Sequence, residues 1–360
     1  MMSFSQSYNS KRKLFSGGAA IVACASLFFS SCQKERVQPL PKVTLPAGAP
    51  FVLVQPQLSV QPADSKTSPY IGVLTGVVSL PSHLIVSGYQ GTILRYSRSS
   101  KKWTLVSSPV RGDFYGLTVT GSGTLWISGD RGLLMKSPDA GLHWSAVTSG
   151  VAPLFLNAIS FPTPTVGYIV GEKGTILKTV DGGDHWSRLS SPVQKNLYGV
   201  AFSDELHGVL GGWHKTLLTT SDGGDHFNTV DLPIQKITRQ KPSLNSIWSQ
   251  GKIVLVAGDH GLLFQSTDGG RSFTQIQTGG IKDLYGVCRM GNGDIIAVGE
   301  RGELIVLSSG SQAGWKVSRP LGSFHGTDWL SVSCGNARMR VVGSNGSILL
   351  QETNAPSLAK

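Results

Sequence analysis

The feature that most constrains this chain of 360 residues is an internal repeat. A Gly-x-x-Gly element recurs along it, and successive copies lie 41, 42, 41, 46, 41 and 44 residues apart. The first glycines of the copies are Gly88, Gly129, Gly171, Gly212, Gly258, Gly299 and Gly343. In the fourth copy Lys215 replaces the second glycine. A unit of this size cannot bury its own faces, so the repeat predicts one closed domain rather than several independent ones.

Each unit carries the pattern of four short strands. In the third unit an opening strand at 156–159 precedes one strand that enters the glycine hairpin and one that leaves it, and a fourth begins near Trp186. A composition with 45 glycines and only 15% charged residues favours short strands joined by tight turns. Four strands in a period of this length are typical of a propeller blade. We therefore predict an all-β fold, a seven-bladed β-propeller over residues 51–360.

The seventh unit lacks a fourth strand. No aromatic strand follows 347–350 before the chain ends, whereas the apolar stretch 51–54 stands before the first unit without a partner. Pairing of these two segments would remove the exposed edges of an open ring. We predict that the N-terminal strand closes the propeller.

The first 31 residues have the organisation of an export signal. A basic stretch at 11–13 precedes an apolar stretch at 14–29, and Ser30-Ser31 stand directly before Cys32. The segment 29–32 resembles the lipobox of bacterial lipoproteins, which implies a lipid on Cys32; Cys24 and an ordinary cleaved signal are the alternatives. Residues 32–50 contain four prolines and predict an extended tether. The expected location is the bacterial cell envelope, with the side of the membrane undecided.

The charge balance narrows the class of partner. Removal of the three basic residues of the predicted signal lowers the formal net charge from +11 to +8. An exported protein does not normally meet nucleic acid, so the excess favours acidic proteins, acidic glycans or anionic lipid.

Two cysteines lie outside the export signal, Cys288 and Cys334. An oxidising compartment permits a disulfide between them. They fall at offset positions of adjacent inner strands, however, and strand alternation then predicts that they point to opposite faces. We therefore expect two buried free thiols.

A second motif, Ser/Thr-x-Asp-x-Gly-x-x-aromatic, occurs four times, and its aspartates are Asp139, Asp181, Asp222 and Asp268. It resembles the Asp-box, or BNR repeat, of sialidase-type propellers. The aspartate can accept hydrogen bonds from the amides of its own turn, and the glycine can take a positive φ. The pairs at 184–185 and 225–226 superficially suggest a metal or catalytic site. Because they recur at fixed positions on different blades, we predict no metal, cofactor or catalytic residue from them.

Over residues 70–350 the chain resembles the photosystem II stability/assembly-factor-like family of BNR propellers. The resemblance rests on the opening strand Leu-x-Gly-Val at 197–200, Val-Gly-x-x-Gly-x-Ile at 170–176 and Thr-x-Asp-Gly-Gly-x-x-Trp at 179–186. Members of that family include non-enzymatic assembly factors that bind membrane-protein intermediates. The resemblance therefore implies a propeller that binds a protein partner.

Propeller topology places the Gly-x-x-Gly turns opposite the Asp-boxes, and ligand sites in related propellers tend to use that opposite side. The candidate contacts there are Arg111, Arg131, Lys173, Lys195, Trp213, His214, Lys215, Lys236, Arg239, Lys241, His260, Lys282 and Arg301. The acidic neighbours are Asp113, Asp130, Glu172, Asp259, Asp283 and Glu300. The alternative interpretation is a solvated rim of mixed charge. Residues 232–243 belong to the longest interval and hold three of the cations without an acid, which favours an acidic partner there.

An enzymatic function finds less support in the sequence. The chain lacks the Arg-Ile-Pro motif that sialidases share, and no segment marks a nucleophilic tyrosine with its glutamate. We predict a lipid-anchored, monomeric, non-enzymatic propeller that binds an envelope protein or a membrane-protein complex. A glycan-binding module and a divergent glycoside hydrolase are the alternatives, since rim carboxylates could supply an acid pair.

Overall fold

The computed structural model describes residues 51–54, 56, 71–234, 241–309, 315–320, 327–335 and 338–351. The chain divides into two units, 1–43 and 44–360, and all the described residues belong to the second. The predicted signal peptide, Cys32 and the tether therefore lie outside the described residues. Among the residues that are described, no helix has the length and apolar character needed to cross a bilayer.

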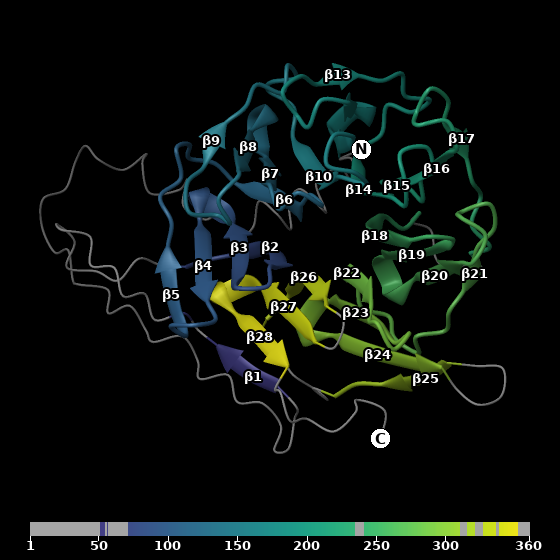
Figure 1. The fold of residues 1–360 in the computed structure, drawn as a ribbon. Coiled ribbons are helices and arrows are strands. Elements are labelled where there is room, and N and C mark those ends of the chain that lie inside the picture. The colour runs from purple at the N-terminus through teal and green to yellow at the C-terminus, as the bar shows by residue number, and fades with distance from the viewer. Residues whose placement is uncertain are drawn as a thin grey trace, which may run out of the picture. The chain divides into compact units, whose positions relative to one another are not determined.

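The second unit is a ring of seven four-stranded antiparallel sheets, which confirms the predicted all-β propeller (Figure 1). Blades 1–3 consist of β2 (Leu74–Ser79), β3 (His83–Gly88), β4 (Ile93–Ser97), β5 (Lys102–Leu105), β6 (Phe114–Val119), β7 (Leu125–Gly129), β8 (Leu134–Ser137), β9 (Ser145–Ala146), β10 (Leu156–Ser160), β11 (Gly167–Gly171), β12 (Ile176–Thr179) and β13 (Ser187–Arg188). Blades 4–7 consist of β14 (Leu197–Phe202), β15 (Gly208–Gly212), β16 (Leu217–Thr220), β17 (Asn228–Thr229), β18 (Leu244–Gln250), β19 (Ile253–Gly258), β20 (Leu263–Ser266), β21 (Thr274–Gln275), β22 (Leu284–Arg289), β23 (Ile295–Gly299), β24 (Leu304–Ser309), β25 (Trp315–Ser318), β26 (Trp329–Cys334), β27 (Met339–Gly343), β28 (Ile348–Gln351) and β1 (Phe51–Val54).

The hydrophobic core lies between neighbouring blades. The second strand of a blade is buried along its whole length, as in β7, β11 and β23. Burial on both faces explains why these strands are continuous apolar runs rather than alternating ones. The outer strands β9, β13 and β17 have only two residues each and are exposed.

The N-terminal strand closes the ring, as predicted. β1 pairs antiparallel with β28, with Phe51 opposite Gln351 and Val54 opposite Ile348. Phe51 is only 4% exposed. Blade 7 therefore combines three strands from the end of the chain with one from the start, which covers an edge that would otherwise be open.

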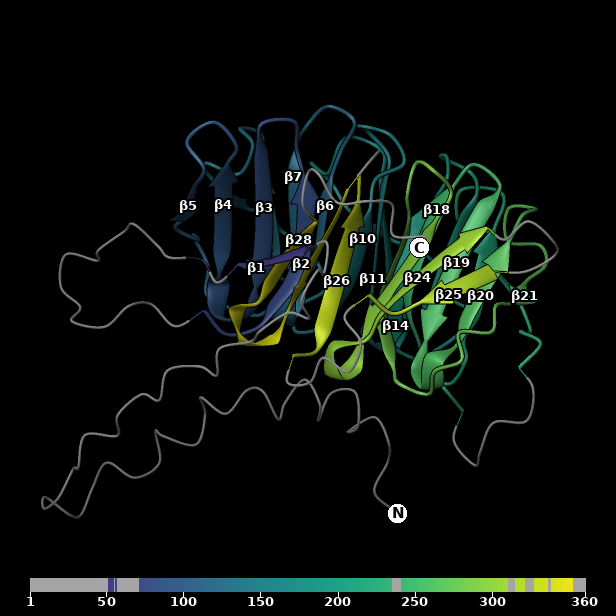
Figure 2. The same cartoon turned by 90° about the horizontal axis from the view of Figure 1, so that it is seen from below.

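The two ends of the ring carry different turns (Figure 2). One end, here the Asp-box end, holds the turns between the third and fourth strands. The other, here the Gly-turn end, holds the turns between the second and third strands and the connections between blades. Short 3-10 turns mark the Gly-turn end: η1 (Tyr89–Gly91), η2 (Asp130–Gly132), η3 (Glu172–Gly174), η4 (Asp259–Gly261), η5 (Glu300–Gly302) and η6 (Ser344–Gly346).

Cys288 and Cys334 form a disulfide between blades 6 and 7, with their Cα atoms 5.8 Å apart. The prediction of two free thiols is therefore wrong. Cys288 shares a face of β22 with Gly286, where an added Cβ would meet Val332 Cγ1 of blade 7 at 3.3 Å. Cys334 lies two residues after Val332 and faces blade 6 in return. The two blades stack face to face, so the side of β26 that contacts blade 6 meets the side of β22 that contacts blade 7. The strand alternation that we used to predict separate thiols therefore places both sulfurs in this interface.

Candidate functional site

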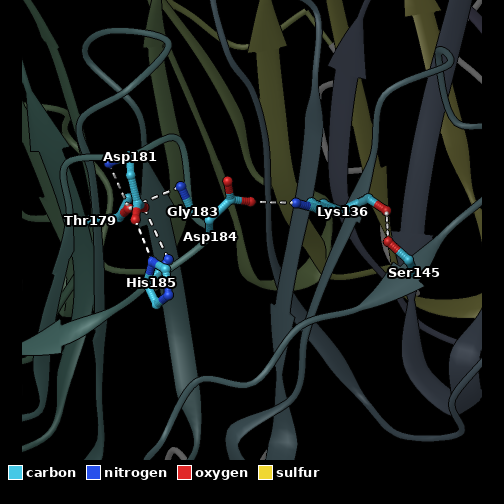
Figure 3. Close-up of polar contacts among 7 residues, drawn as sticks. All are labelled: Lys136, Ser145, Thr179, Asp181, Gly183, Asp184 and His185. Carbon is cyan, nitrogen blue, oxygen red and sulfur yellow. Dashed lines mark hydrogen bonds and ion pairs between the residues drawn. The ribbon is translucent and has the colours of Figure 1, made fainter.

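The Asp-box turns use their polar groups internally. In blade 3, Thr179 Oγ1 donates to Asp181 Oδ1 at 2.8 Å, and the amide of Gly183 donates to Thr179 Oγ1 at 2.9 Å (Figure 3). His185 approaches the same carboxylate twice, with its amide 3.0 Å from Oδ1 and Nδ1 2.7 Å from Oδ2. The His185 amide bond, followed by the side-chain bonds from His185 and Thr179, lowers the pKa of Asp181 below its ordinary range. This carboxylate is a turn acceptor.

The other three Asp-boxes repeat this arrangement. Asp139, Asp222 and Asp268 each accept a hydrogen bond from the Ser or Thr two residues before them and from the amide four residues after them. Asp184, within the box of blade 3, forms an ion pair with Lys136 Nζ of blade 2 at 2.9 Å (Figure 3). In the described part of the chain, no group of three or more His, Cys, Asp or Glu side chains could hold a metal ion.

The Gly-turns share one backbone framework and differ in the side chain at the tip. In blade 2 the amide of Asp130 donates to Asp113 O of the same blade, and the amide of Gly132 donates to Leu154 O of the next. The tip residue between them, Arg131, has φ +50° and an 80% exposed side chain. The residues at this tip position are Gln90, Arg131, Lys173, His214, His260, Arg301 and Asn345, all with positive φ. The seven tip residues are all polar and include no acid; Gln90, Arg131, Lys173 and Arg301 are exposed, and the other three are half-buried.

Two carboxylates that the sequence analysis gave as acidic neighbours of the candidate contacts fasten these turns. The tip amides of Gln90 and His260 donate to Asp113 Oδ1 and Asp283 Oδ1 of the following blade, each at 3.0 Å. Asn196 and Asp328 accept the same bond in two other blades. The missed signal was in the sequence: each of these residues directly precedes the first residue of an opening strand.

Several predicted contact residues already have partners within the chain. Lys282 Nζ lies 3.0 Å from Glu303 Oε2, and Arg319 Nε lies 2.8 Å from Glu303 Oε1. Burial alone would raise the pKa of Glu303, but the hydrogen bonds from Arg319 and Lys282 lower it. Arg131 and Arg301 each lie 3.6 Å from the acid that precedes them in the turn, while Arg111 and Lys173 are exposed. Lys236 and Arg239 lie outside the described residues.

Blade 4 brings five of the predicted residues together. The Trp213 and His214 rings stack with centroids 3.8 Å apart. Burial, followed by the positive charges of Lys195 and Lys241, lowers the pKa of His214. Lys215 follows His214 in the same turn. We call Lys195, Trp213, His214, Lys215 and Lys241 the blade-4 cluster.

Lys215 departs from the backbone rule of the other turns. It has φ +51° at the position where six blades have glycine. In blade 3 a Cβ at that position, on Gly174, would collide with Val193 O of the next connection. Blade 4 accepts lysine where the interval to the next repeat is longest, and the Lys215 amide donates to Pro242 O of that connection. Blade 4 therefore has two successive non-glycine residues at positive φ, His214 and Lys215, where each of the other six turns has one followed by glycine.

Comparisons with known proteins support the assignment of the fold. The family model described as photosynthesis system II assembly factor YCF48 matches residues 184–281. No curated protein matches the sequence. A solved structure of YCF48 bound to a D1 peptide superimposes with a TM-score of 0.65 at 14% identity, over 87% of this chain and 99% of that one.

Two further structures show how widely the fold is shared. YCF48 from Cyanidioschyzon merolae gives a TM-score of 0.62 at 17% identity, over 79% of this chain and 97% of that one. The GH74 enzyme of Niastella koreensis gives 0.61 at 14% identity, over 79% of this chain and 53% of the enzyme. The blades and Asp-boxes define the chain as a BNR-type β-propeller. Among such propellers it is similar to YCF48.

Proposed function

We propose that this protein is a non-enzymatic propeller that binds a segment of a protein partner at its Gly-turn end, with the blade-4 cluster as the main contact. The observation that carries the proposal is the clustering of three lysines around a stacked Trp213–His214 pair at a strained turn. The similarity to a YCF48 structure bound to a D1 peptide supports a protein ligand over a small molecule.

The chemistry of the cluster favours an acidic segment. Among the described residues, Lys195, Lys215 and Lys241 form no ion pair, whereas Lys282 and Arg319 both pair with Glu303. Unpaired ammonium groups attract carboxylates over distances of about 10 Å at moderate salt. The Trp213 ring adds an apolar surface of the kind that dominates the energy of many interfaces. Together they suit a peptide that combines acidic with apolar or aromatic residues.

The experiment reverses three positive charges of the blade-4 cluster and compares this variant with one in which three positive charges elsewhere are reversed. A triple variant with Lys195, Lys215 and Lys241 changed to Glu should retain the fold but lose partner capture from envelope extracts and binding of a labelled acidic peptide. The matched control changes three exposed cations away from the Gly-turn end, Arg188, Lys252 and Arg271, to Glu. If the control loses the partner and the cluster variant keeps it, the proposed binding end is wrong.

The proposal also includes the cellular location of the protein. The lipobox-like segment before Cys32 supports a lipid anchor in the bacterial cell envelope, where the propeller would assist assembly or stabilisation of a membrane complex. Cys32→Ala should abolish incorporation of a palmitate analogue and release the protein from membranes. Unchanged labelling would redirect the assignment to Cys24 or to another site.

A glycan-binding or glycoside-hydrolase function is the second candidate, because the chain superimposes on about half of a GH74 enzyme. A glycan array and a hydrolysis assay on plant and bacterial polysaccharides separate it from the first. Glycan binding that survives the triple lysine variant would favour this second function.

A further inference from the structure

The interface between blades 7 and 1 holds a buried arginine near the Asp-box end. Arg340 lies in β27, opposite Ser333 and Leu350, and is 8% exposed. Val342, two residues further along the same strand face, packs in one cluster with Leu74 of blade 1. Arg340 therefore points into the interface, where β27 and β28 run beside the strands of blade 1 (Figure 1).

Two more guanidinium groups lie close to Arg340. Arg98, which follows β4, donates from Nη2 to Ser79 Oγ at 2.9 Å. Arg338 stands two residues before Arg340, whose Nη1 donates to Arg338 O at 3.5 Å. Burial, followed by the positive charges of Arg98 and Arg338, lowers the pKa of Arg340 to about 10, so it remains a cation at neutral pH. We call these three residues the arginine cluster.

The described strands of the two blades carry no carboxylate to balance this charge. Residues 71–112 and 329–351 contain neither Asp nor Glu. The arginine ion pairs of the described residues involve Arg131, Arg301 and Arg319, and none of them involves the cluster. A guanidinium does not give up its proton in a protein, and a buried charge without a counter-ion is costly. Among the described residues, this buried cation therefore has no counter-ion.

We propose that the arginine cluster binds a phosphate group in the interface of blades 7 and 1. Planar guanidinium forks match the oxygens of a phosphate, and three positive charges suit a dianion better than a single carboxylate. Arg338 is exposed, Arg98 is half-buried and Arg340 is buried, so the cluster includes a side chain in contact with solvent. The site is distinct from the blade-4 cluster, which lies at the Gly-turn end of the ring.

The phosphate has two possible sources, free phosphate and the headgroup of an anionic phospholipid. β1 enters the ring at this same end, since Phe51 pairs with the last residue of β28. Phe51, the first described residue, therefore lies at the same end of the ring as the cluster. The chemistry of recognition is shared by both sources, and the experiment separates them.

The first arm measures melting temperature in chloride and in millimolar phosphate at equal ionic strength, with the mature protein and Arg340→Met. In phosphate the wild type should melt higher than in chloride, and the variant should lose this difference. In chloride the variant should be at least as stable as the wild type, because an apolar side chain replaces an uncompensated charge. Arg188→Met, an exposed site on another blade, controls for the general stabilising effect of phosphate.

The second arm uses Arg98→Gln and Arg338→Gln, which keep the test valid if Arg340→Met does not fold. Each should weaken the apparent phosphate affinity by about tenfold or more, the cost of one charged hydrogen bond. Co-sedimentation with phosphatidylglycerol vesicles, but not with phosphatidylcholine vesicles, that depends on Arg340 assigns the phospholipid source. A phosphate response without vesicle binding assigns free phosphate.

Two results would overturn the proposal. One is an equal rise of the melting temperature in phosphate for the wild type, Arg188→Met and Arg340→Met, because the response would then not depend on Arg340. The other concerns Glu352, the first acid after β28 in the sequence. If phosphate raises the melting temperature only in Glu352→Gln, a carboxylate of the chain itself occupies the cluster in the wild type.

Discussion

Blades 2–5 and blades 6, 7 and 1 reach the same four-stranded geometry by different means. Each of blades 2–5 has an Asp-box whose carboxylate is bonded within its own turn. In blade 1, Ser99 stands where those four blades have the aspartate. Lys101, two residues further on, takes φ +55° where blades 2–5 all have glycine. The closing half relies instead on two long-range links, the β1–β28 pairing and the Cys288–Cys334 disulfide, and blade 6 adds the ion pairs of Glu303 with Lys282 and Arg319.

This difference separates local from long-range stabilisation. An Asp-box stabilises one turn and needs only residues close in sequence, so it can be repeated from blade to blade. Ring closure joins segments that are far apart in the chain and needs contacts that no repeat can supply. Both candidate sites, the blade-4 cluster and the arginine cluster, lie where residues depart from the repeat, at Lys215 and Arg340, as expected of functional positions.

Deletion of residues 51–60 should have the largest effect on the closing half. It removes the pairing of β1 with β28 and the burial of Phe51, which is comparable to a large-to-small core substitution of about 4 kcal/mol. The exposed edge of β28 should also promote association. Thermal melting with light scattering measures both effects, and equal melting temperatures for the two proteins would contradict the closure role.

Removal of the disulfide should cost nearly as much. Cys288 and Cys334 are 46 residues apart, and the chain-entropy relation assigns about 4 kcal/mol to a loop of this length. We expect Cys288→Ser/Cys334→Ser to unfold at lower urea concentration than the wild type under oxidising conditions. A reductant should shift the wild type toward the variant and leave the variant unchanged; a wild type indifferent to reductant would exclude the link.

Gly183→Ala tests the Asp-box half at one turn. Gly183 has φ +92°, and a Cβ there would collide with the buried Trp126 ring of blade 2. Strain plus overpacking should cost about 3 kcal/mol. Gly150→Ala is the matched control, because Gly150 has φ +74° and nothing within 4 Å, so that only about 1 kcal/mol is expected. If Gly183→Ala and Gly150→Ala lose the same free energy of unfolding in urea denaturation, the Trp126 ring moves aside without a loss of stability, and the expected overpacking is wrong.

The smallest expected effect is the loss of stability at low pH. Hydrogen bonds lower the pKa of Asp181, Asp222 and Asp268 from an ordinary value of 3.8. A carboxyl with a lowered pKa in the folded state stabilises the fold above its unfolded pKa and loses that contribution as pH falls through the folded value. Stability should therefore decline with falling pH only below about pH 4 on their account. Asp181→Asn should flatten this slope in urea denaturation between pH 2 and 5, and an unchanged slope would contradict the assignment.

The fold could be predicted because its signals are local and repeated. Gly171 and its six counterparts, each at the end of a second strand, give the blade count without knowledge of any long-range contact. The disulfide could not be predicted from alternation within a sheet, because Cys288 and Cys334 belong to different sheets that stack face to face. The fastening role of Asp113 and Asp283 was visible in the sequence, but only as a position relative to the opening strand.

The sequence by itself determined the number of blades, the strand order within each blade and the ends at which the two kinds of turn lie, because repeated turn chemistry and strand alternation are properties of short segments. Only the tertiary structure decided which charged groups are already paired. Lys282 and Lys241 are both cations in connections between blades, yet only Lys282 lies against a buried carboxylate, Glu303. Pairing depends on which side chains the fold brings within about 4 Å. Lys282 and Glu303 are separated in the sequence by β22 and β23, so their approach is set by how these strands pack and not by neighbours in the chain.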